Sequence, residues 1–588
     1  MPSALVVEMA STGGGVLLPL SVLVPFIGVL AGFVLGGRNA QRIAMVTLLA
    51  GFGISLAMAA TMLQSGESLV YLLGGWMPPL GVALRADGLS LVMMLAVPVV
   101  IAGITLYARA DFGTPPGERE RRAPLAFWTL LLAIWGSLNL VFVSGDLFTL
   151  YVALELLTFA AVPLVSLDGK GETLRSALRY LVYALLGSVF YLLGTVLMYG
   201  GYGTLDISLL AGIVRPDAVT LVAAALMTAG LLAKTALVPL HLWLPPAHAG
   251  APAAASAVLS ALVIKGSWFL VVRLWFDVFP GVVSFSSAQL LGALGAAAIL
   301  IGNVVALRQE RLKLLVAYST VAQIGYLFLM FPLAFDTGAS GLARGDALTG
   351  GMLQAISHAT AKAAMFMAAG LVYHALGHDR IAELGGVARA LPVTVLTFAI
   401  AGLALMGLPP SGAYAAKKLL LGAAAGSGQW WWSAVLEAGA LLTASYVVLV
   451  LAQSFSPAQK ASAPHAPVSR LGEWAALALA ICSLLLGFAA VGPTPLDAVS
   501  NPLALTELAS AAAILLGGGV IALALANRLP PIAAKNAVAS LLDPMRLLTT
   551  PVGAFLVRVD AWLRRWAVAG LSLLAVAIAL GIAMVASR

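Results

Sequence analysis

Sixteen apolar stretches, each about 20 residues long and separated by connections, run through almost the whole chain of 588 residues. A transmembrane helix needs about 20 predominantly apolar residues to cross a hydrocarbon core about 30 Å thick. Only 10% of the residues are charged, whereas a soluble domain has about a quarter. The sequence therefore predicts an all-α polytopic membrane protein with helices over 16–36, 42–62, 88–108, 124–143, 146–167, 176–199, 218–236, 252–275, 286–307, 312–335, 348–376, 392–425, 433–455, 471–490, 506–526 and 566–586.

Lysine and arginine are distributed unevenly over the connections. Counted from the first helix, the odd-numbered connections hold 22 of the 32 basic residues and the even-numbered ones hold three. Cytoplasmic loops of membrane proteins carry an excess of Lys and Arg, so the odd connections are predicted to be cytoplasmic and the N-terminus to face outward. The regular alternation also supports the count of sixteen helices.

Composition argues against two other classes of function. The net charge of +8 could suggest a nucleic-acid partner, but the sequence has no basic patch with interleaved aromatic residues, so none is expected. The single cysteine, Cys482, lies in an apolar run without a partner for a disulfide, an iron–sulfur cluster or a thiolate zinc site. We therefore expect neither a cofactor nor redox chemistry on this chain.

Four lysines lie inside apolar runs, where an ammonium costs about 2.5–3.5 kcal/mol on insertion scales. One explanation is structural, in which a lysine bonds to the carbonyls of a broken helix. Four such lysines in one chain favour a proton or ion pathway, because each carries the insertion cost separately. Arg273, in contrast, is close to a helix end and is expected to snorkel to the interface. The four are Lys234, Lys265, Lys362 and Lys417.

Prolines interrupt two of the apolar regions. Between Lys234 and Lys265 the chain reads TALVPLHLWLPPAHAGAP and carries His241 and His248; a second interruption, GLPPSGAYAAKK, precedes Lys417. Irregular backbone at membrane depth is tolerated only where it is buried in protein or lines a water-filled cavity. Breaks together with lysines therefore predict a hydrated axis.

One carboxylate is expected near the middle of the membrane. If its helix starts near Asp146, Glu155 lies about 14 Å deep at 1.5 Å per residue. It needs a partner there, and Lys234 is the natural one, with a purely structural ion pair as the alternative. Further along the chain, His358 and Lys362 are spaced i, i+4 and share one helical face.

Three other acidic residues have local explanations. Asp87 and Asp146 precede apolar runs and are predicted to be helix N-caps. Glu437 lies near the outer start of its helix, and both an exit-side function and a solvated helix end remain open.

Interrupted helices at matching positions predict an internal repeat. The fourth helix of the set 124–275 and the fourth of the set 286–455 are both interrupted, and a five-helix repeat must be inverted in the membrane. Such pairs are typical of inverted-repeat transporters with a site near the midplane. The expected units are 1–123 (three helices), 124–275, 286–455, 456–490 (helix fourteen) and 491–588, a C-terminal extension with two helices and an interfacial linker that includes FLVRVDAWLRRW.

Several long motifs carry a family resemblance. PLHLWLPPAHAGAP, LKLLVAYSTVAQIGYL, SHATAKAAMFMAAG, GLPPSGAYAAKK and the lead-in YLLGGWMPPLGVALRADGLS resemble the proton-translocating antiporter-like subunits of respiratory complex I, Mrp-type cation/proton antiporters and membrane-bound hydrogenases. The D-type Mrp and the N- or M-type complex I subunits are the most similar. The resemblance covers about residues 16–490, the family's fourteen-helix core, and the two C-terminal runs lie beyond it.

The resemblance implies roles for individual residues. Glu155 and Lys234 would form a paired gate and Lys265 the central relay. His248 and His358 with Lys362 would form a bridge, and Lys417 would be the outlet lysine. The family pattern PPLSGFxGK is PPSGAYAAKK here, which leaves Lys417 and Lys418 both open, although counting from the proline pair favours Lys417.

The resemblance also implies partners and a place. We expect other membrane subunits, the lipid bilayer and protons as partners, with Na⁺ or K⁺ as candidate counter-cations, in a bacterial or archaeal cytoplasmic membrane. A redox module or a countermoving cation would drive transport, so the chain could be a subunit of an NADH:quinone oxidoreductase or of a hydrogenase-type translocase. The alternatives are a free-standing solute–proton symporter, for which the axis offers few aromatic or amide groups, and a polytopic enzyme, for which the outer loops lack acidic metal ligands.

Overall fold

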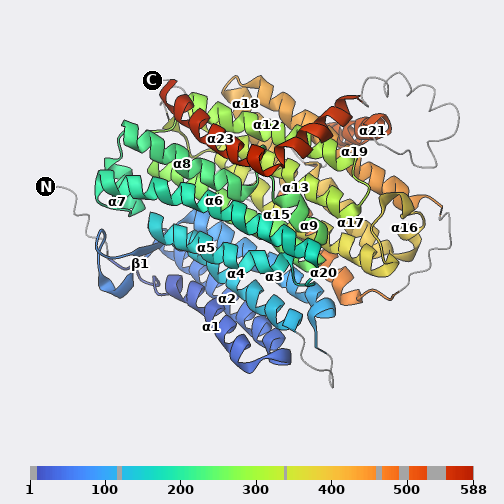
Figure 1. Ribbon diagram of the computed structural model, residues 1–588, viewed down its shortest axis with the longest axis horizontal. Helices are drawn as coiled ribbons and strands as arrows, with labels where there is room; N and C mark the ends of the chain where they lie inside the picture. Colours follow the sequence, from blue (N-terminus) through green and yellow to red (C-terminus); the bar gives the residue numbers. More distant parts are fainter. Residues whose placement is uncertain are drawn as a thin grey trace.

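The computed structural model describes residues 10–114, 122–336, 341–457, 466–488, 502, 504–525 and 551–586, and these residues form a bundle of helices (Figure 1). Fifteen of the described helices are long and apolar enough to cross a membrane. The remaining predicted run, 392–425, is an interrupted helix, α17 (Pro392–Leu405) followed by α18 (Gly412–Gly426). The prediction of an all-α polytopic membrane protein is therefore confirmed.

The first eight predicted runs correspond to helices in chain order. Short elements lie between them: α7 (Ile207–Ile213) and α9 (Leu244–Gly250). The eighth run, Ala253–Val278, contains α10 (Ala253–Val258), a π-helical turn over Leu259–Val263, α11 (Ile264–Arg273) and a second π-helical turn over Leu274–Val278. The other spans are α1 (Leu17–Leu35), α2 (Gly37–Ser65), α3 (Gly88–Phe112), α4 (Arg122–Val143), α5 (Leu147–Val165), α6 (Gly171–Tyr202) and α8 (Ala218–Thr235).

The second half of the chain follows the same pattern of long helices and short elements. The short elements are α14 (Met330–Leu333) and α16 (Val387–Ala390). The long helices are α12 (Phe285–Leu307), α13 (Leu312–Phe328), α15 (Asp346–Leu376), α19 (Trp430–Phe455), α20 (Arg470–Leu485), α21 (Leu505–Leu525) and α23 (Trp566–Ala586).

Two small β-hairpins, which the sequence patterns did not predict, lie in even-numbered connections. β1 (Leu69–Leu72) pairs antiparallel with β2 (Ala83–Ala86), and β3 (Phe335–Asp336) pairs with β4 (Gly341–Leu342). The backbone of Gly145 bonds to Ala83 at 3.1 Å and to Ile207 at 2.9 Å, which joins the second, fourth and sixth connections. We call this end of the bundle, marked by β1 and β2, the hairpin end.

Odd-numbered connections meet at the opposite end. Backbone hydrogen bonds join the ninth connection to the eleventh and the eleventh to the thirteenth. The alternation of ends along the chain therefore agrees with the sixteen-helix count. The bonds run from Leu312 N to Asp379 O (2.7 Å), from Ile381 N to Glu310 O (2.9 Å) and from Gly386 N to Ser456 O (2.8 Å).

Two helices that start at the hairpin end, α3 and α5, are capped by aspartates. Asp87 accepts a hydrogen bond from Ser90 N at 3.0 Å, and Asp146 accepts one from Thr149 N at 2.8 Å. Both were predicted as N-caps, and the structure confirms them. A side-chain oxygen at this position satisfies one of the N–H groups that a first helical turn leaves unpaired.

The two interrupted helices break in the same way. α8 is followed by Ala236 at φ +60° and α17 by Gly407 at φ +67°, both in the left-handed region. Ala236 is a non-glycine residue in that region, which costs about 1–2 kcal/mol and persists only where packing compensates. In each break the residue after the left-handed one donates its backbone N–H to the carbonyl five residues earlier. Leu237 N donates to Leu232 O and Leu408 N to Leu403 O, both at 3.2 Å.

α6 and α8 cross with their backbones in contact. A Cβ atom on Gly230 of α8 would overlap the carbonyl oxygen of Gly187 on α6, and the reverse substitution would meet the Gly230 carbonyl. Small residues at helix crossings allow this close approach in membranes. The crossing lies one turn from Lys234 and therefore fixes the depth and direction of that side chain.

The C-terminal extension packs along the second half of the bundle and returns across its flank. α21 runs beside α19 in the same direction, with Gly517 facing Leu441 and Gly519 facing Val448. The helical stretch 551–563 lies at the opposite end, where Gly553 meets Arg308. α23 then lies across α8 and α12 (Figure 1). Residues 526–550, which belong largely to the predicted interfacial linker, lie outside the described residues.

Candidate functional site

Glu155 and Lys234 form an ion pair inside the bundle. The Lys234 amine on α8 lies 3.2 Å from a carboxylate oxygen of Glu155 on α5 and donates to the Thr158 hydroxyl at 2.8 Å. The Ser188 hydroxyl of α6 donates to the same carboxylate oxygen. Both side chains are largely buried. Removing one partner of a buried pair leaves an uncompensated charge, which costs about 3–5 kcal/mol.

Lys265 and His358 meet where the two five-helix sets meet. The Lys265 amine on α11 lies 2.6 Å from Nδ1 of His358 on α15, and it donates to the carbonyl of Ser260 at 2.7 Å. Ser260 lies in the π-helical turn before α11, a distortion that recurs at functional sites. The Ser260 hydroxyl also lies 2.9 Å from the Thr320 hydroxyl on α13. The contact therefore joins elements of both halves of the chain.

Lys362 lies one turn after His358 on α15 and has different partners. Its amine donates to the carbonyl of Val316 at 3.2 Å and to the hydroxyl of Ser319, both on α13. Among the described residues, neither Lys362 nor Lys265 forms an ion pair with a carboxylate, although both are fully enclosed. These two buried amines therefore contact hydroxyl, carbonyl and imidazole groups, without a carboxylate in the described part of the chain.

His248 lies apart from the other predicted bases. It belongs to α9, the second half of the first interrupted helix, and its ring stacks on Phe366 of α15 at 4.8 Å between centroids. Neither ring nitrogen has a hydrogen-bond partner within the described part of the chain. The structure therefore brings His248 to α15, one turn beyond Lys362, without a direct bond to His358 or Lys362.

A cavity of about 500 Å³ opens beside α9 at the opposite end of the bundle. Its lining is rich in ionisable groups, and the Lys313 amine within it donates to the carbonyl of Ala251, just after α9. Burial alone would raise the pKa of Asp168 in this lining, but bonds from the Thr173 hydroxyl and the Lys170 backbone amide lower it. The ionisable lining residues are Asp111, Asp168, Lys170, Glu172, Arg311, Lys313 and His374, together with Tyr107 and Tyr373.

Lys417 and Lys418 differ in burial and in partner. Lys417 on α18 is 9% exposed and lies 3.3 Å from a carboxylate oxygen of Glu437 on α19. Lys418 has a more exposed side chain and lies 2.6 Å from Glu507 on α21. Glu437 has a half-exposed side chain. Of the two lysines that the motif left open, Lys417 is therefore the one enclosed in the bundle.

Two glutamine amides connect the middle of the bundle to the second break. Gln354 of α15 donates to Gln323 of α13 at 3.1 Å, and Gln323 donates to the carbonyl of Leu405 at 3.0 Å. The motifs discussed above single out neither residue for a role in the site. The sequence signal for this contact is an amide side chain within each of two apolar helices.

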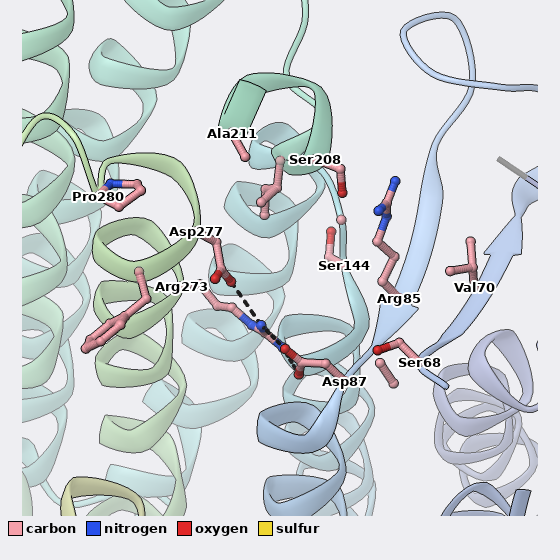
Figure 2. A pocket seen from close by; sticks show the side chains of 14 residues that line it. Ser68, Val70, Arg85, Asp87, Ser144, Ser208, Ala211, Arg273, Asp277 and Pro280 are labelled. Atoms are coloured by element: carbon pink, nitrogen blue, oxygen red, sulfur yellow. Dashed lines mark hydrogen bonds and ion pairs between the residues drawn. The ribbon is translucent and has the colours of Figure 1, made fainter. Parts of the chain in front are cut away.

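Arg273 is held by acidic side chains at the hairpin end, and its expected reach to the membrane interface stays a prediction. Its guanidinium donates to Asp277 at 3.0 Å and to Ser90 at 2.7 Å, and it forms a bidentate pair with Asp87 (Figure 2). Asp87, Arg273 and Asp277 line a cavity of about 510 Å³ at the hairpin end. Arg344 extends the network by pairing with Asp277. Burial opposes the charged form of Asp87, but the adjacent Arg273 outweighs it and lowers the pKa to about 2.

Within the described residues no group of three or more His, Cys, Asp or Glu side chains is arranged to hold a metal ion. What the geometry offers is proton chemistry, since buried amines, imidazoles and carboxylates in hydrogen-bond contact can hold and pass protons. The two cavities described above lie at opposite ends of the bundle, and the buried lysines and histidines lie between them.

Sequence comparisons match this chain to known membrane subunits. The family profile described as NADH:quinone oxidoreductase/Mrp antiporter, TM, matches residues 144–443. The NADH-quinone oxidoreductase subunit N of Desulforudis audaxviator is 33% identical over 427 residues, which cover 71% of this chain and 82% of that protein. The D-type subunit of the Na(+)/H(+) antiporter of Alkalihalophilus pseudofirmus is 27% identical over 482 residues, covering 80% and 93%.

A solved structure has the same fold. A chain of the Mrp complex from Dietzia sp. superposes with a TM-score of 0.69 at 23% identity, covering 90% of this chain and 99% of that chain. The helices described above therefore share the arrangement of helices in that chain.

Proposed function

Because the chain belongs to the family of membrane subunits described as NADH:quinone oxidoreductase/Mrp antiporter, TM, we propose that it translocates protons as one subunit of a multisubunit membrane complex. The family match confirms the resemblance that the motifs carry. Because its relatives are named as subunits of an oxidoreductase and of a Na(+)/H(+) antiporter, we expect partner membrane subunits here as well.

The proposed route begins at the cavity beside α9. From there a proton reaches Lys234, then Lys265 with His358, then Lys362, and finally Lys417. The observation that carries the proposal is the 2.6 Å contact between Lys265 and His358, because it links basic groups from the two five-helix sets in the enclosed middle of the bundle. Water in the hydrated axis would carry the proton where no side chains touch.

Glu155 would control the first step. A carboxylate 3.2 Å from Lys234 stabilises the charged amine, and its withdrawal favours release of the proton onward. The hydroxyls of Ser188 and Thr158 offer the carboxylate and the amine alternative partners when the pair separates. His248 would serve between the cavity and α15, through water rather than by direct contact.

The remaining assignments follow the family and the charge pattern. The two five-helix sets, 124–275 and 286–455, would be inverted repeats, with the fourth helix of each broken in the same manner.

The orientation in the membrane follows from the charge pattern. The opposite end would face the cytoplasm, and the hairpin end would face the outside of a bacterial or archaeal cytoplasmic membrane. Protons would leave past Lys417, driven by a redox partner or by a countermoving Na⁺ or K⁺.

The test uses the native complex. It would be purified through a tag on this chain and reconstituted in liposomes containing a pH-sensitive dye. Lys234→Ala and Lys265→Ala should abolish proton movement without loss of partner subunits, whereas Arg380→Ala, at an exposed ion pair with Glu383, should retain it. Wild-type pumping in both lysine variants would refute the route.

The same preparation identifies the driving reaction. Partners with iron–sulfur or nickel centres would point to an oxidoreductase, and a set of small hydrophobic subunits to an antiporter. Proton-coupled uptake of a solute by the isolated chain would instead establish the alternative, a free-standing symporter.

A further inference from the structure

Hydroxyl and amide side chains from α12, α13 and α19 meet in the interior of the second five-helix set. We call this group the hydroxyl cluster. Each of its side chains is at most 7% exposed, and the route proposed above uses none of them. The members of the cluster are Asn303, Ser319, Tyr326, Thr443 and Tyr446.

The hydroxyl cluster begins at Lys362. The amine of Lys362 donates to the hydroxyl of Ser319 on α13. The Tyr446 hydroxyl of α19 faces the hydroxyls of Ser319 and Thr443. Thr443 in turn donates to the side-chain oxygen of Asn303 on α12 at 3.3 Å. Polar side chains of three helices therefore meet beside one amine of the proposed route.

The cluster extends toward Glu437, the partner of Lys417. The Tyr326 hydroxyl faces that of Thr443, and the negative charge of Glu437 acts on it. A Cβ atom on Gly439 would overlap the Tyr326 hydroxyl, so this hydroxyl lies directly against the backbone of α19. Glu437 is two residues before Gly439 on the same helix. The far end of the cluster is therefore close to the turn of α19 that carries Glu437.

Three polar atoms of the cluster lack a hydrogen-bond partner within the described part of the chain. They are Nδ2 of Asn303 and the hydroxyls of Tyr326 and Tyr446. Leaving a buried polar group without a partner costs about 1–3 kcal/mol, and buried water molecules typically supply the missing bonds. An amide N–H needs an acceptor, which water offers and a metal cation does not. The cluster is therefore suited to water and not to Na⁺ or K⁺.

We propose that the hydroxyl cluster binds water and relays protons from Lys362 to Glu437, which supplies the step between Lys362 and Lys417. This inference rests on the proposed function in proton translocation and adds relay residues to it. From Tyr446 back to Glu437, nine residues of α19 span about 14 Å at 1.5 Å per residue. Hydroxyls on the intervening turns, linked by water, divide this length into short transfers.

A second polar contact leads from α15 to the second break, but it is less suited to proton transfer. It consists of the amides of Gln354 and Gln323, and Gln323 donates to the carbonyl of Leu405. An amide side chain neither gains nor loses a proton near neutral pH. A hydroxyl or a water molecule has both an O–H donor and free lone pairs, so it can accept one proton while it releases another.

The transfer makes and breaks only O–H and N–H bonds. The ammonium of Lys362 gives a proton to the Ser319 oxygen, and each oxygen along the chain accepts one proton as it releases its own. The carboxylate of Glu437 takes up the last proton and becomes neutral. It then no longer stabilises the charged Lys417, which favours release of the Lys417 proton outward. The Lys417 amine recovers a proton from Glu437, and no oxidant or reductant takes part.

The experiment measures driven proton movement in liposomes that contain the assembled complex, in H₂O and in D₂O. Thr443→Val keeps the shape but removes the hydroxyl, and the rate should fall about tenfold, equivalent to about 1.4 kcal/mol on the barrier. The solvent isotope effect should rise, because transfer through the interrupted chain then limits the rate. Thr443→Ser restores the hydroxyl and should recover most of the rate. A packing role alone predicts the opposite order, since serine leaves a small cavity and valine does not.

Tyr446→Phe removes a second hydroxyl and should cause a loss of similar size. In the double variant with Thr443→Val the two losses should be strongly non-additive, because either change alone interrupts the chain. Tyr183→Phe is the matched control. It removes a buried hydroxyl of α6 that donates to the carbonyl of Ala569 at 3.3 Å, outside the cluster, and should keep the wild-type rate and isotope effect. Each variant is compared at equal recovery of partner subunits.

Lys234→Ala separates this inference from the proposed function. If proton movement does not depend on Lys234, the proposed function fails and the relay fails with it. If it does depend on Lys234, three results would each overturn the relay alone. These are a wild-type rate and isotope effect in both Thr443→Val and Tyr446→Phe, a faster rate in Thr443→Val than in Thr443→Ser, and an equal loss in Tyr183→Phe.

Discussion

Lys265 of α11 and His358 of α15 come within 2.6 Å of each other although they lie 93 residues apart in sequence. Two basic groups at this distance repel when both are protonated, so a proton on one disfavours a proton on the other. The π-helical turn before α11 supplies the Ser260 carbonyl that holds the amine in place. The pair therefore joins the two halves of the chain, and its part in the proposed proton route stays a prediction.

His358→Ala should stop translocation while leaving Lys265 in place. The amine would keep its bond to the Ser260 carbonyl but lose the group to which it passes its proton. The rate should fall to background in liposomes that contain the complex. His358→Gln, which keeps a hydrogen-bonding side chain that cannot be protonated, is the matched variant, and full activity in it would contradict a proton-carrying role.

Glu155→Gln should uncouple the first step without dismantling the fold. The amide retains the hydrogen bond from Ser188 and a dipole toward Lys234, so assembly is kept, but the charge that stabilises the ammonium is lost. We expect severe loss of proton movement with unchanged recovery of partner subunits on purification. In a double-mutant cycle with Lys234→Met the two losses should be strongly non-additive, and additive losses would show that the residues do not act as a pair.

Gly230→Ala should loosen the crossing of α6 and α8. The added methyl overlaps the Gly187 carbonyl, and overpacking of this kind costs about 1–3 kcal/mol. Because the crossing lies one turn from Lys234, transport should decline along with thermal stability in detergent. Gly200→Ala on α6 is the control, since its Cβ would meet nothing within 4 Å. Equal melting temperatures for the two variants would argue against the close crossing.

Asp87→Asn should lower stability at neutral pH but matter less in acid. The pKa of Asp87 is about 2, below its ordinary value of 3.8, so the folded state favours the charged form. That contribution is fully present above the ordinary value and is lost as the pH falls through about 2. The difference in melting temperature between wild type and variant should therefore be constant near neutrality and shrink between about pH 4 and pH 2. A difference in melting temperature that grows as the pH falls would contradict the lowered pKa of Asp87.

Lys417→Ala should cost more activity than Lys418→Ala. Lys417 is enclosed and pairs with Glu437, whereas Lys418 has a more exposed side chain and contacts the extension through Glu507. We expect proton release to stop in the first variant and to slow about tenfold in the second, as for the loss of one charge-assisted hydrogen bond. Rates of translocation by the reconstituted complex distinguish the two, and the opposite order would assign the outlet to Lys418.

Local patterns were enough to predict most of the fold. Apolar runs of spanning length became helices, and the prolines after Lys234 and before Lys417 marked the two breaks, because both signals depend on residues close together in the chain. The partner of Glu155 could be named from physical need, since a carboxylate at membrane depth requires a cation. The contact is present in the structure, while its role in transport stays a prediction.

Contacts between distant segments were not predictable in the same way. The position of Arg273 near a helix end predicts that it reaches the interface, but its partner Asp87, 186 residues away in the sequence, could not be named. The sequence predicts an interfacial segment over FLVRVDAWLRRW, but in the structure Asp560 of this segment contacts His241, which is 319 residues away. Each of these pairs is fixed by how helices pack, which hydrophobic periodicity does not encode.

The path of α23 has a consequence for assembly. This helix already covers the flank formed by α8 and α12, and it is fastened there by bonds to Tyr183 and Ser284. A neighbouring protein or a lipid that approaches this flank would therefore meet α23 before α8 or α12. The apolar side chains that α23 exposes, such as Leu571 and Ile578, set the chemistry of that surface.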